Sequence, residues 1–195
     1  MRAWRTRCAA AAGLCAGLAS ALAATAPQAL DELMRTLAAQ RQARVAYTEV
    51  QHLAVLNEPL NSSGELVYEA PDRLEQRILA PRPETLVLAH GMLSATRSGR
   101  TRVLELAAAP QLAPLIECLR ATLAGDRAAL ERLFNLELAG DANHWVLTLT
   151  PRDAAAARTV ASVRIAGEGA RLHTVEIVAA DGDRSLLTLG AELPP

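Results

Sequence analysis

The chain has 195 residues, of which 51% are hydrophobic, and its formal net charge is −1. These values describe one globular domain with a core of its own, and they exclude the basic surface that a nucleic-acid-binding protein needs. The sequence contains no lysine, and its basic side chains besides histidine are all arginine. Together with the abundance of alanine, this bias indicates a GC-rich bacterial genome rather than a function.

The N-terminus has the features of a cleavable export signal. Arginines precede an apolar run from Cys8 to Leu22, and Ala21-Leu22-Ala23 fits the small-x-small rule of signal peptidase. The run of about 15 residues is shorter than the ~20 that a membrane span needs, so an uncleaved anchor is the weaker alternative. We predict a signal peptide at residues 1–23 and a single domain at 24–195, located in the periplasm of a Gram-negative bacterium.

The cysteines indicate neither a lipid anchor nor a disulfide. A lipoprotein signal needs an apolar residue three positions before its modified cysteine, whereas Arg5 precedes Cys8 and Ala12 precedes Cys15. Cys118 is the one cysteine that remains after cleavage. We therefore predict that Cys118 is a small buried side chain without a disulfide partner.

The predicted elements begin with a helix and continue as a series of short strands. Pro27 to Ala43 is predicted to be a helix, because proline suits a first turn and leucines recur at 3- and 4-residue spacing. From Arg44 onward, apolar residues occupy every second position between glycines and prolines, which predicts an antiparallel meander with one dry face. These strands are predicted at residues 44–53, 64–69, 73–79, 84–90, 93–97 and 101–107.

A change of period then marks a helical insert. Pro110 to Ala124 is predicted to be a helix with one apolar stripe, which Gly125 ends, and Asp126 is placed to cap a short helix from Arg127 to Phe134. Strand periodicity returns afterwards, and Asp181-Gly182 is typical of a hairpin turn. The later strands are predicted at residues 134–138, 145–149, 159–165, 171–178 and 184–189, which brings the sheet to about ten strands.

A large antiparallel meander twists and curls, so it either closes on itself or stays open with its concave face covered by helices. The mid-chain helix divides the sheet in sequence, as a lid over the concave face would. Incomplete filling by the helices would leave a dry cavity for acyl chains, since each buried CH₂ contributes about 0.8 kcal/mol. The alternative is that every apolar residue packs in a filled core.

No catalytic or metal-binding constellation is predicted. Ser62-Ser63-Gly64 lacks the flanking glycine of a nucleophile elbow, and no helix follows Gly167-Glu168-Gly169. Asp181-Gly182-Asp183 lacks the distal glutamate of a calcium loop. The histidines have no metal-ligand spacing, so we expect neither an enzyme nor a cofactor, but a protein that binds or carries something apolar. The histidines are His52, His90, His144 and His173.

The glycine and proline punctuation of the first meander has a recognisable layout. Pro71 precedes a polar strand, Glu84 opens an apolar one, and Gly91 lies in the following hairpin. The residues that carry the pattern are Gly64, Leu66, Pro71, Pro81, Glu84, Leu86, Val87, Leu88 and Gly91. This layout resembles the core of the outer-membrane lipoprotein carrier family, the LolA-like proteins.

The resemblance implies an α+β fold: an open antiparallel β half-barrel of about ten strands, with an N-terminal helix and a mid-chain helical lid over the concave face. It also implies a carrier that takes acylated lipoproteins from an inner-membrane releasing transporter and passes them to an outer-membrane receptor. Two positions depart from the family. Ala70 stands where the family has an arginine linked to passing cargo on, and Leu74 stands where it has an aromatic linked to the releasing complex. The chain is therefore identified as a divergent paralogue.

We predict a monomer that binds the acyl chains of lipoproteins, or another lipid, between the dry face and the lid. A lipid- or protein-sensing regulatory domain of the same fold is the alternative, and a structural partner of an inner-membrane transport complex is a third hypothesis. The predicted lipid-binding residues are Leu66, Tyr68, Leu74, Ile78, Leu86 and Leu88 from the sheet, and Leu112, Leu115, Ile116 and Leu119 from the lid.

Overall fold

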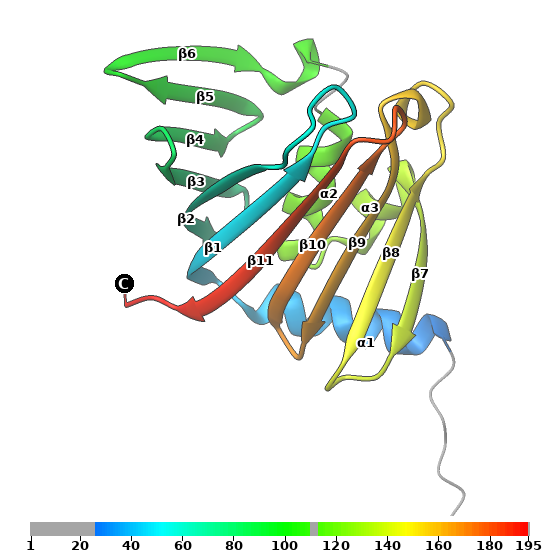
Figure 1. Ribbon diagram of the computed structural model, residues 1–195. Helices are drawn as coiled ribbons and strands as arrows, with labels where there is room; N and C mark the ends of the chain where they lie inside the picture. The colour runs from blue at the N-terminus through cyan, green and yellow to red at the C-terminus, as the bar shows by residue number, and fades with distance from the viewer. Residues whose placement is uncertain (1–25, 110–112, 195) are drawn as a thin grey trace, which may run out of the picture.

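The structure is a computed structural model that describes residues 26–109 and 113–194. Its described part forms one antiparallel eleven-stranded sheet with helices on the concave side (Figure 1). The strand order is β6-β5-β4-β3-β2-β1-β11-β10-β9-β8-β7, so β6 and β7 are free edges and the sheet does not close. The predicted open half-barrel is therefore confirmed.

The elements follow the predicted order. The helices are α1 (Ala26–Ala39), α2 (Ala113–Leu123) and α3 (Arg127–Leu133), with short 3₁₀ turns at Leu106–Ala108 and Ala156–Arg158. The first six strands are β1 (Gln42–His52), β2 (Leu60–Glu69), β3 (Arg73–Ala80), β4 (Glu84–Ala89), β5 (Met92–Arg97) and β6 (Arg100–Glu105). The last five are β7 (Phe134–Gly140), β8 (Trp145–Pro151), β9 (Val160–Glu168), β10 (Arg171–Ala179) and β11 (Arg184–Glu192).

Two predicted boundaries were wrong for reasons that lie in strand pairing. The first helix ends at Ala39 rather than Ala43, because β1 already begins to pair with β2 at Gln42. The strand predicted at 64–69 begins at Leu60, which lies opposite Gln51 of β1. The predicted start of the lid helix, with Leu112, lies outside the described residues. Within the described part, α2 begins at Ala113.

The short helix that follows the lid, α3, begins as predicted. The Asp126 side chain accepts a hydrogen bond from the Ala129 backbone N–H at 2.9 Å, and this satisfies one of the otherwise free donors at the start of α3. Helix α3 then ends at Leu133, one residue earlier than expected, because Phe134 is already extended and begins β7.

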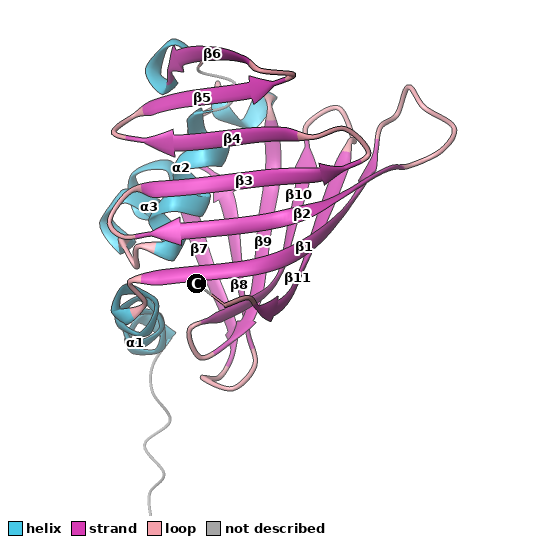
Figure 2. Cartoon of the chain, turned by 90° about the vertical axis from the view of Figure 1, so that its left-hand side faces the viewer, coloured by secondary structure: helices cyan, strands magenta, loops and turns pink. Residues whose placement is uncertain are grey.

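The two halves of the sheet are packed unequally. Helices α1 and α3 lie against the half formed by β7 to β11, where Trp145, Phe134 and Leu130 are almost fully buried (Figure 1). In the half formed by β2 to β6, the buried apolar strand residues are Tyr68 and Leu88, and every residue of β6 is exposed. Figure 2 shows β1 to β6 as a curved layer with the helices on one side. The core therefore fills one half, and the concave face of the other half is only partly covered.

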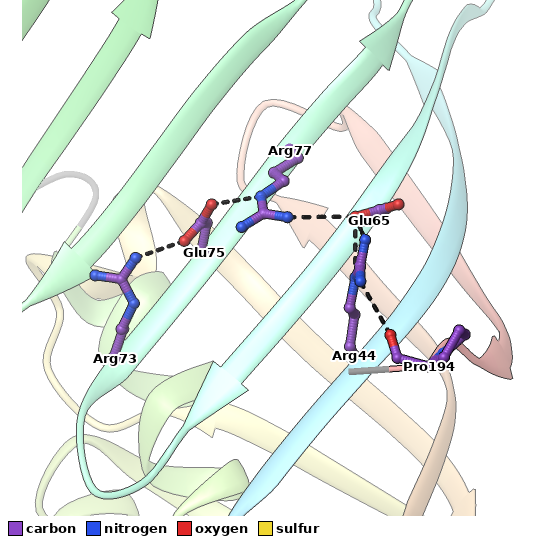
Figure 3. A network of polar contacts seen from close by, with 6 residues as sticks. All are labelled: Arg44, Glu65, Arg73, Glu75, Arg77 and Pro194. Carbon is purple, nitrogen blue, oxygen red and sulfur yellow. Dashed lines mark hydrogen bonds and ion pairs between the residues drawn. The ribbon is translucent and has the colours of Figure 1, made fainter.

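The opposite, convex face of β1, β2 and β3 carries a row of alternating charges (Figure 3). Glu65 accepts a hydrogen bond from Arg44 at 2.9 Å and lies 3.6 Å from Arg77. Glu75, which is 6% exposed, accepts hydrogen bonds from Arg73 at 2.6 Å and from Arg77 at 2.5 Å. The row neutralises a buried carboxylate on this face and connects β1, β2 and β3 through ion pairs.

This row gives a pH dependence to stability. Burial raises the pKa of Glu75, but the hydrogen bonds from Arg77 and Arg73 outweigh it, so that its pKa in the folded protein is lowered. A lowered folded pKa gives stability that is present above the unfolded pKa of about 4.3 and is lost as pH falls through the folded value. We expect Glu75→Gln to destabilise the protein at pH 7 and the difference from wild type to shrink below about pH 4. Urea unfolding of Glu75→Gln and wild type between pH 7 and pH 3 measures this difference in stability. The control is Glu137→Gln, since Glu137 is exposed on β7. A stability difference between Glu75→Gln and wild type that stays constant with pH would contradict the prediction.

Candidate functional site

Two adjoining cavities lie between the concave face and α2. The larger has a volume of about 370 Å³ and the smaller about 60 Å³. They share four lining residues: Leu74, Leu119, Val175 and Leu187. The two cavities therefore adjoin each other, and together they run from β4 and β5 across β1 to β10.

Helix α2 supplies one wall of this space. Leu115, Ile116 and Leu119 recur at helical spacing and line the larger cavity, while Leu119 and Leu123 line the smaller. All four side chains are only half-buried. An apolar stripe that remains half-buried against an apolar sheet face lacks the close packing of a protein core, where few voids exceed the size of a water molecule.

Most residues predicted from the sequence lie at these cavities. Leu74, Leu86, Leu88, Leu115, Ile116 and Leu119 line the larger cavity, and Leu66, Tyr68, Leu74 and Leu119 line the smaller. Ile78 lies on the same sheet face, opposite Glu84 of β4, but lines neither cavity. Leu112 lies outside the described residues. A role of these side chains in lipid binding stays a prediction.

The sequence reasoning missed the opposite wall. Residues of the C-terminal strands complete the larger cavity because β11 pairs with β1, which brings the end of the chain beside the first strand. Their alternation was visible in the sequence, but the pairing that places them at the lid was not. The missed apolar lining residues of these strands are Val163, Ile165, Val175, Ile177 and Leu187; Leu93 of β5, on the first wall, was missed as well.

Two polar side chains also line the larger cavity, Glu49 of β1 and Gln76 of β3. The Gln76 amide donates a hydrogen bond to the Tyr47 hydroxyl at 3.0 Å. Burial raises the pKa of Tyr47, so its hydroxyl stays neutral. The other described residues that line this cavity are apolar apart from Cys118 of α2. A cavity of this kind suits an apolar ligand with a small polar group.

A cysteine, Cys118 of α2, also lines the larger cavity. Burial raises the pKa of the Cys118 thiol to about 12, so the nucleophilic thiolate is scarce at neutral pH. Within residues 26–109 and 113–194, no group of three or more His, Cys, Asp or Glu side chains is arranged to hold a metal ion. No helix in the described ranges is both long and apolar enough to span a bilayer.

Tyr68 carries a hydroxyl that is buried without a hydrogen-bond partner in the described part of the chain. Its side chain is 3% exposed and lines the smaller cavity. A buried hydroxyl that loses water and gains no partner costs about 1–3 kcal/mol. A ligand that offers a hydrogen bond at this wall would recover part of that cost.

We expect Tyr68→Phe to stabilise the ligand-free protein by about 1 kcal/mol, because it removes an unsatisfied polar atom and keeps the ring. The matched control is Tyr47→Phe, which leaves the Gln76 amide without its acceptor and should destabilise the protein. Urea unfolding at constant m-value measures both. If Tyr68→Phe destabilises as much as Tyr47→Phe, the hydroxyl of Tyr68 has a partner and the assignment is wrong.

Comparisons with known proteins agree with this architecture. The sequence model of the family described as "Outer membrane lipoprotein carrier protein LolA-like" matches residues 20–192. A search of curated protein sequences finds no match. Solved structures with the same fold include a putative outer membrane lipoprotein-sorting protein domain from Vibrio parahaemolyticus. It is 11% identical, covers 87% of this chain and 93% of its own, and has a TM-score of 0.51.

Two further solved structures are similar at lower TM-scores. A LolA superfamily protein from Nitrosomonas europaea is 14% identical, covers 89% of this chain and 95% of its own, and has a TM-score of 0.46. MucB in the MucA/MucB complex of Pseudomonas aeruginosa is 17% identical, with a TM-score of 0.43, and the match covers 85% of this chain and 58% of that one. At these identities the likeness concerns the fold alone.

Proposed function

Because the chain belongs to the LolA-like family of outer membrane lipoprotein carriers, we propose that it is a periplasmic carrier that binds acyl chains in the larger cavity. The cargo is a lipoprotein or another lipid, which the protein moves toward the outer membrane. The predicted export signal at residues 1–23 supports the periplasmic location. The chain binds its cargo and performs no chemistry on it.

One observation carries the proposal: the apolar faces of α2 and the sheet meet only partly and leave a partly open space of about 370 Å³ between them. This volume falls within the range of about 300–1,000 Å³ that is typical of small-molecule sites. Each CH₂ that moves from water into such a space contributes about 0.8 kcal/mol. A chain of several methylenes therefore suffices for stable binding without any covalent step.

The half-buried stripe on α2 also supports a lid that moves. Residues 113–117 at the start of the helix, with Leu115 and Ile116 among them, include no buried residue, whereas Cys118, Ala121 and Thr122 further along are buried. The C-terminal part of α2 is thus anchored to the core, while its first turn has less to hold it. We infer that the first turn of α2 opens to admit the chain.

Two departures from the family pattern, Ala70 and Leu74, support a carrier that serves one dedicated pathway rather than lipoproteins in general. Ala70 cannot supply the guanidinium that the resemblance places there. Leu74 lines both cavities, so the position of the family's aromatic faces the interior of this protein. An inner-membrane releasing transporter and an outer-membrane receptor remain the proposed partners. They would have to recognise other surfaces of this chain.

Saturable uptake of the neutral fluorophore N-phenyl-1-naphthylamine, and its displacement by dodecanol and by a diacylated lipopeptide, test the proposal. We expect one site per protein in the wild type. Ile116→Trp fills the cavity from the lid and should remove uptake while the fold persists, whereas Val103→Trp, exposed on β6, should leave uptake unchanged. Unsaturable uptake by a folded wild-type protein would contradict the proposal.

A further inference from the structure

Glu49 is a buried carboxylate on the wall of the larger cavity. It lies in the middle of β1, on the concave face, opposite Leu187 of β11 and Ser62 of β2. Its residue exposure is 8%, and it lines the cavity together with Gln76 and apolar side chains. A charged group in such surroundings is costly unless other groups compensate it.

The compensation within the protein is incomplete. One carboxylate oxygen of Glu49, Oε1, accepts hydrogen bonds from the Gln51 amide at 2.7 Å and from the Ser185 hydroxyl at 2.6 Å. The other, Oε2, accepts one from the Ser62 hydroxyl at 3.1 Å. All three donors are neutral. Among the described residues no arginine or histidine forms an ion pair with Glu49.

Glu75 is a second buried carboxylate, and it differs from Glu49 in how its charge is compensated. It is as buried as Glu49, at 6% exposure, but it lies on the convex face and is paired with Arg73 and Arg77 (Figure 3). The chain has 17 arginines after the predicted signal, so that positively charged side chains are abundant. Two of them form ion pairs with Glu75, and none in the described part of the chain forms one with Glu49.

The three neutral donors also fix the direction of the Glu49 carboxylate. They come from β1, β2 and β11, so the group is held from three adjacent strands. Each carboxylate oxygen can accept about two hydrogen bonds. Oε2 accepts one from the protein, which leaves an acceptor position on a rigid, negatively charged group that borders the cavity.

We propose that Glu49 binds the protonated amine of an amphiphilic ligand whose apolar part occupies the larger cavity. A charge-assisted hydrogen bond from an ammonium group supplies the positive charge that the protein leaves out. The Gln76 amide, on the same wall, offers a second polar contact. This inference rests on the proposed function, and it adds the class of headgroup that the cavity selects.

The test compares three single-chain amphiphiles that differ only in their head: dodecylamine, dodecanol and dodecanoic acid. Each is titrated into the complex of the wild-type protein with N-phenyl-1-naphthylamine, and displacement of the dye is measured. We expect dodecylamine to displace the dye at a concentration about tenfold lower than dodecanol, and dodecanoic acid to be the weakest, since a hydrogen bond to a charged partner is worth about that factor. Glu49→Gln, which keeps the shape and removes the charge, should reduce the preference for the amine to about twofold.

The controls separate this inference from the function on which it rests. Glu137→Gln removes one negative charge from the exposed face of β7 and should keep the full preference. Equal displacement by the three heads in the wild type overturns the role of Glu49, and so does an unchanged preference in folded Glu49→Gln. Either result leaves the cavity proposal standing, whereas failure of all three to displace the dye removes both. The wild-type comparison needs no variant, so poor folding of Glu49→Gln does not block the test.

Two sources carry this chemistry: the headgroup of an aminolipid and the free amino terminus of a diacylated peptide. Each is compared with its N-acetylated form, which keeps the chains and removes the charge. We expect the free amine to bind about tenfold more tightly for whichever source is the ligand. If acetylation weakens binding of the aminolipid alone, or of the diacylated peptide alone, the affected molecule is the source of the ligand. If acetylation weakens the binding of neither, the inference is overturned.

Discussion

Leu86→Glu is expected to lower the affinity for dye and lipid by about 100-fold or more. Leu86 lies between Gln76 of β3 and Ala95 of β5, on the concave face, and lines the larger cavity. A carboxylate at this place either stays charged, with a desolvation cost of several kcal/mol, or attracts water into the space that the ligand needs. Dye titration measures the binding, and far-UV circular dichroism reports whether the sheet still forms.

The control for this variant lies one residue away on the same strand. Thr85 faces the convex side opposite Arg77, so that Thr85→Glu adds the same charge outside the cavity. It should bind like the wild type. A folded Leu86→Glu protein with wild-type affinity would show that the ligand does not occupy the space between β4 and α2.

Gly64→Ala is expected to have the largest effect on stability, a loss of about 3 kcal/mol or more, on the scale of severe core substitutions. A Cβ atom on Gly64 would lie 1.8 Å from the backbone oxygen of Arg77 on the neighbouring strand. No rotamer change relieves a clash with backbone, so β2 and β3 must separate locally. Strands β3 to β6 join the rest of the sheet through β2, so lipid binding should fall together with stability.

Gly190→Ala provides the comparison, because its new Cβ would lie 3.4 Å from the nearest atom, the backbone oxygen of Ala46. This is an ordinary contact, and we expect a stability change within about 0.5 kcal/mol. Urea unfolding of both variants against wild type decides the matter. Equal stability of the two alanine variants would mean that β2 and β3 are spaced more widely than described.

The architecture could be predicted because its signals are local. The alternation around Leu74, Leu86 and Leu88 marks strands with one dry face, and the stripe of Leu115, Ile116 and Leu119 marks a helix with one apolar side. The ends of the strands were harder to predict, because they depend on pairing between residues that are distant in sequence. The start of β2 at Leu60 follows from its partner Gln51, which no local pattern reveals.

The site could be predicted only in part for the same reason. One wall comes from a continuous meander, and most of its lining residues were predicted. Leu93 of this wall was missed, and Ile78 shares the face but lies beyond the cavity. The other wall depends on the pairing of β1 with β11, which joins residues such as His52 and Arg184 from opposite ends of the domain. Glu49 did leave a signal. The alternation that places Tyr47 on the dry face also places Glu49 there, and a carboxylate at such a position is a departure from the pattern of a plain core.

The central claim is that the space between α2 and the concave face holds an apolar chain. Native mass spectrometry of the mature protein, purified from the periplasm without detergent, tests it most directly. We predict a population with one added mass in the range of a lipid or an acylated peptide, which disappears in Ile116→Trp. A wild-type protein that is always empty, and that remains empty after incubation with total periplasmic and membrane lipids, would contradict the account.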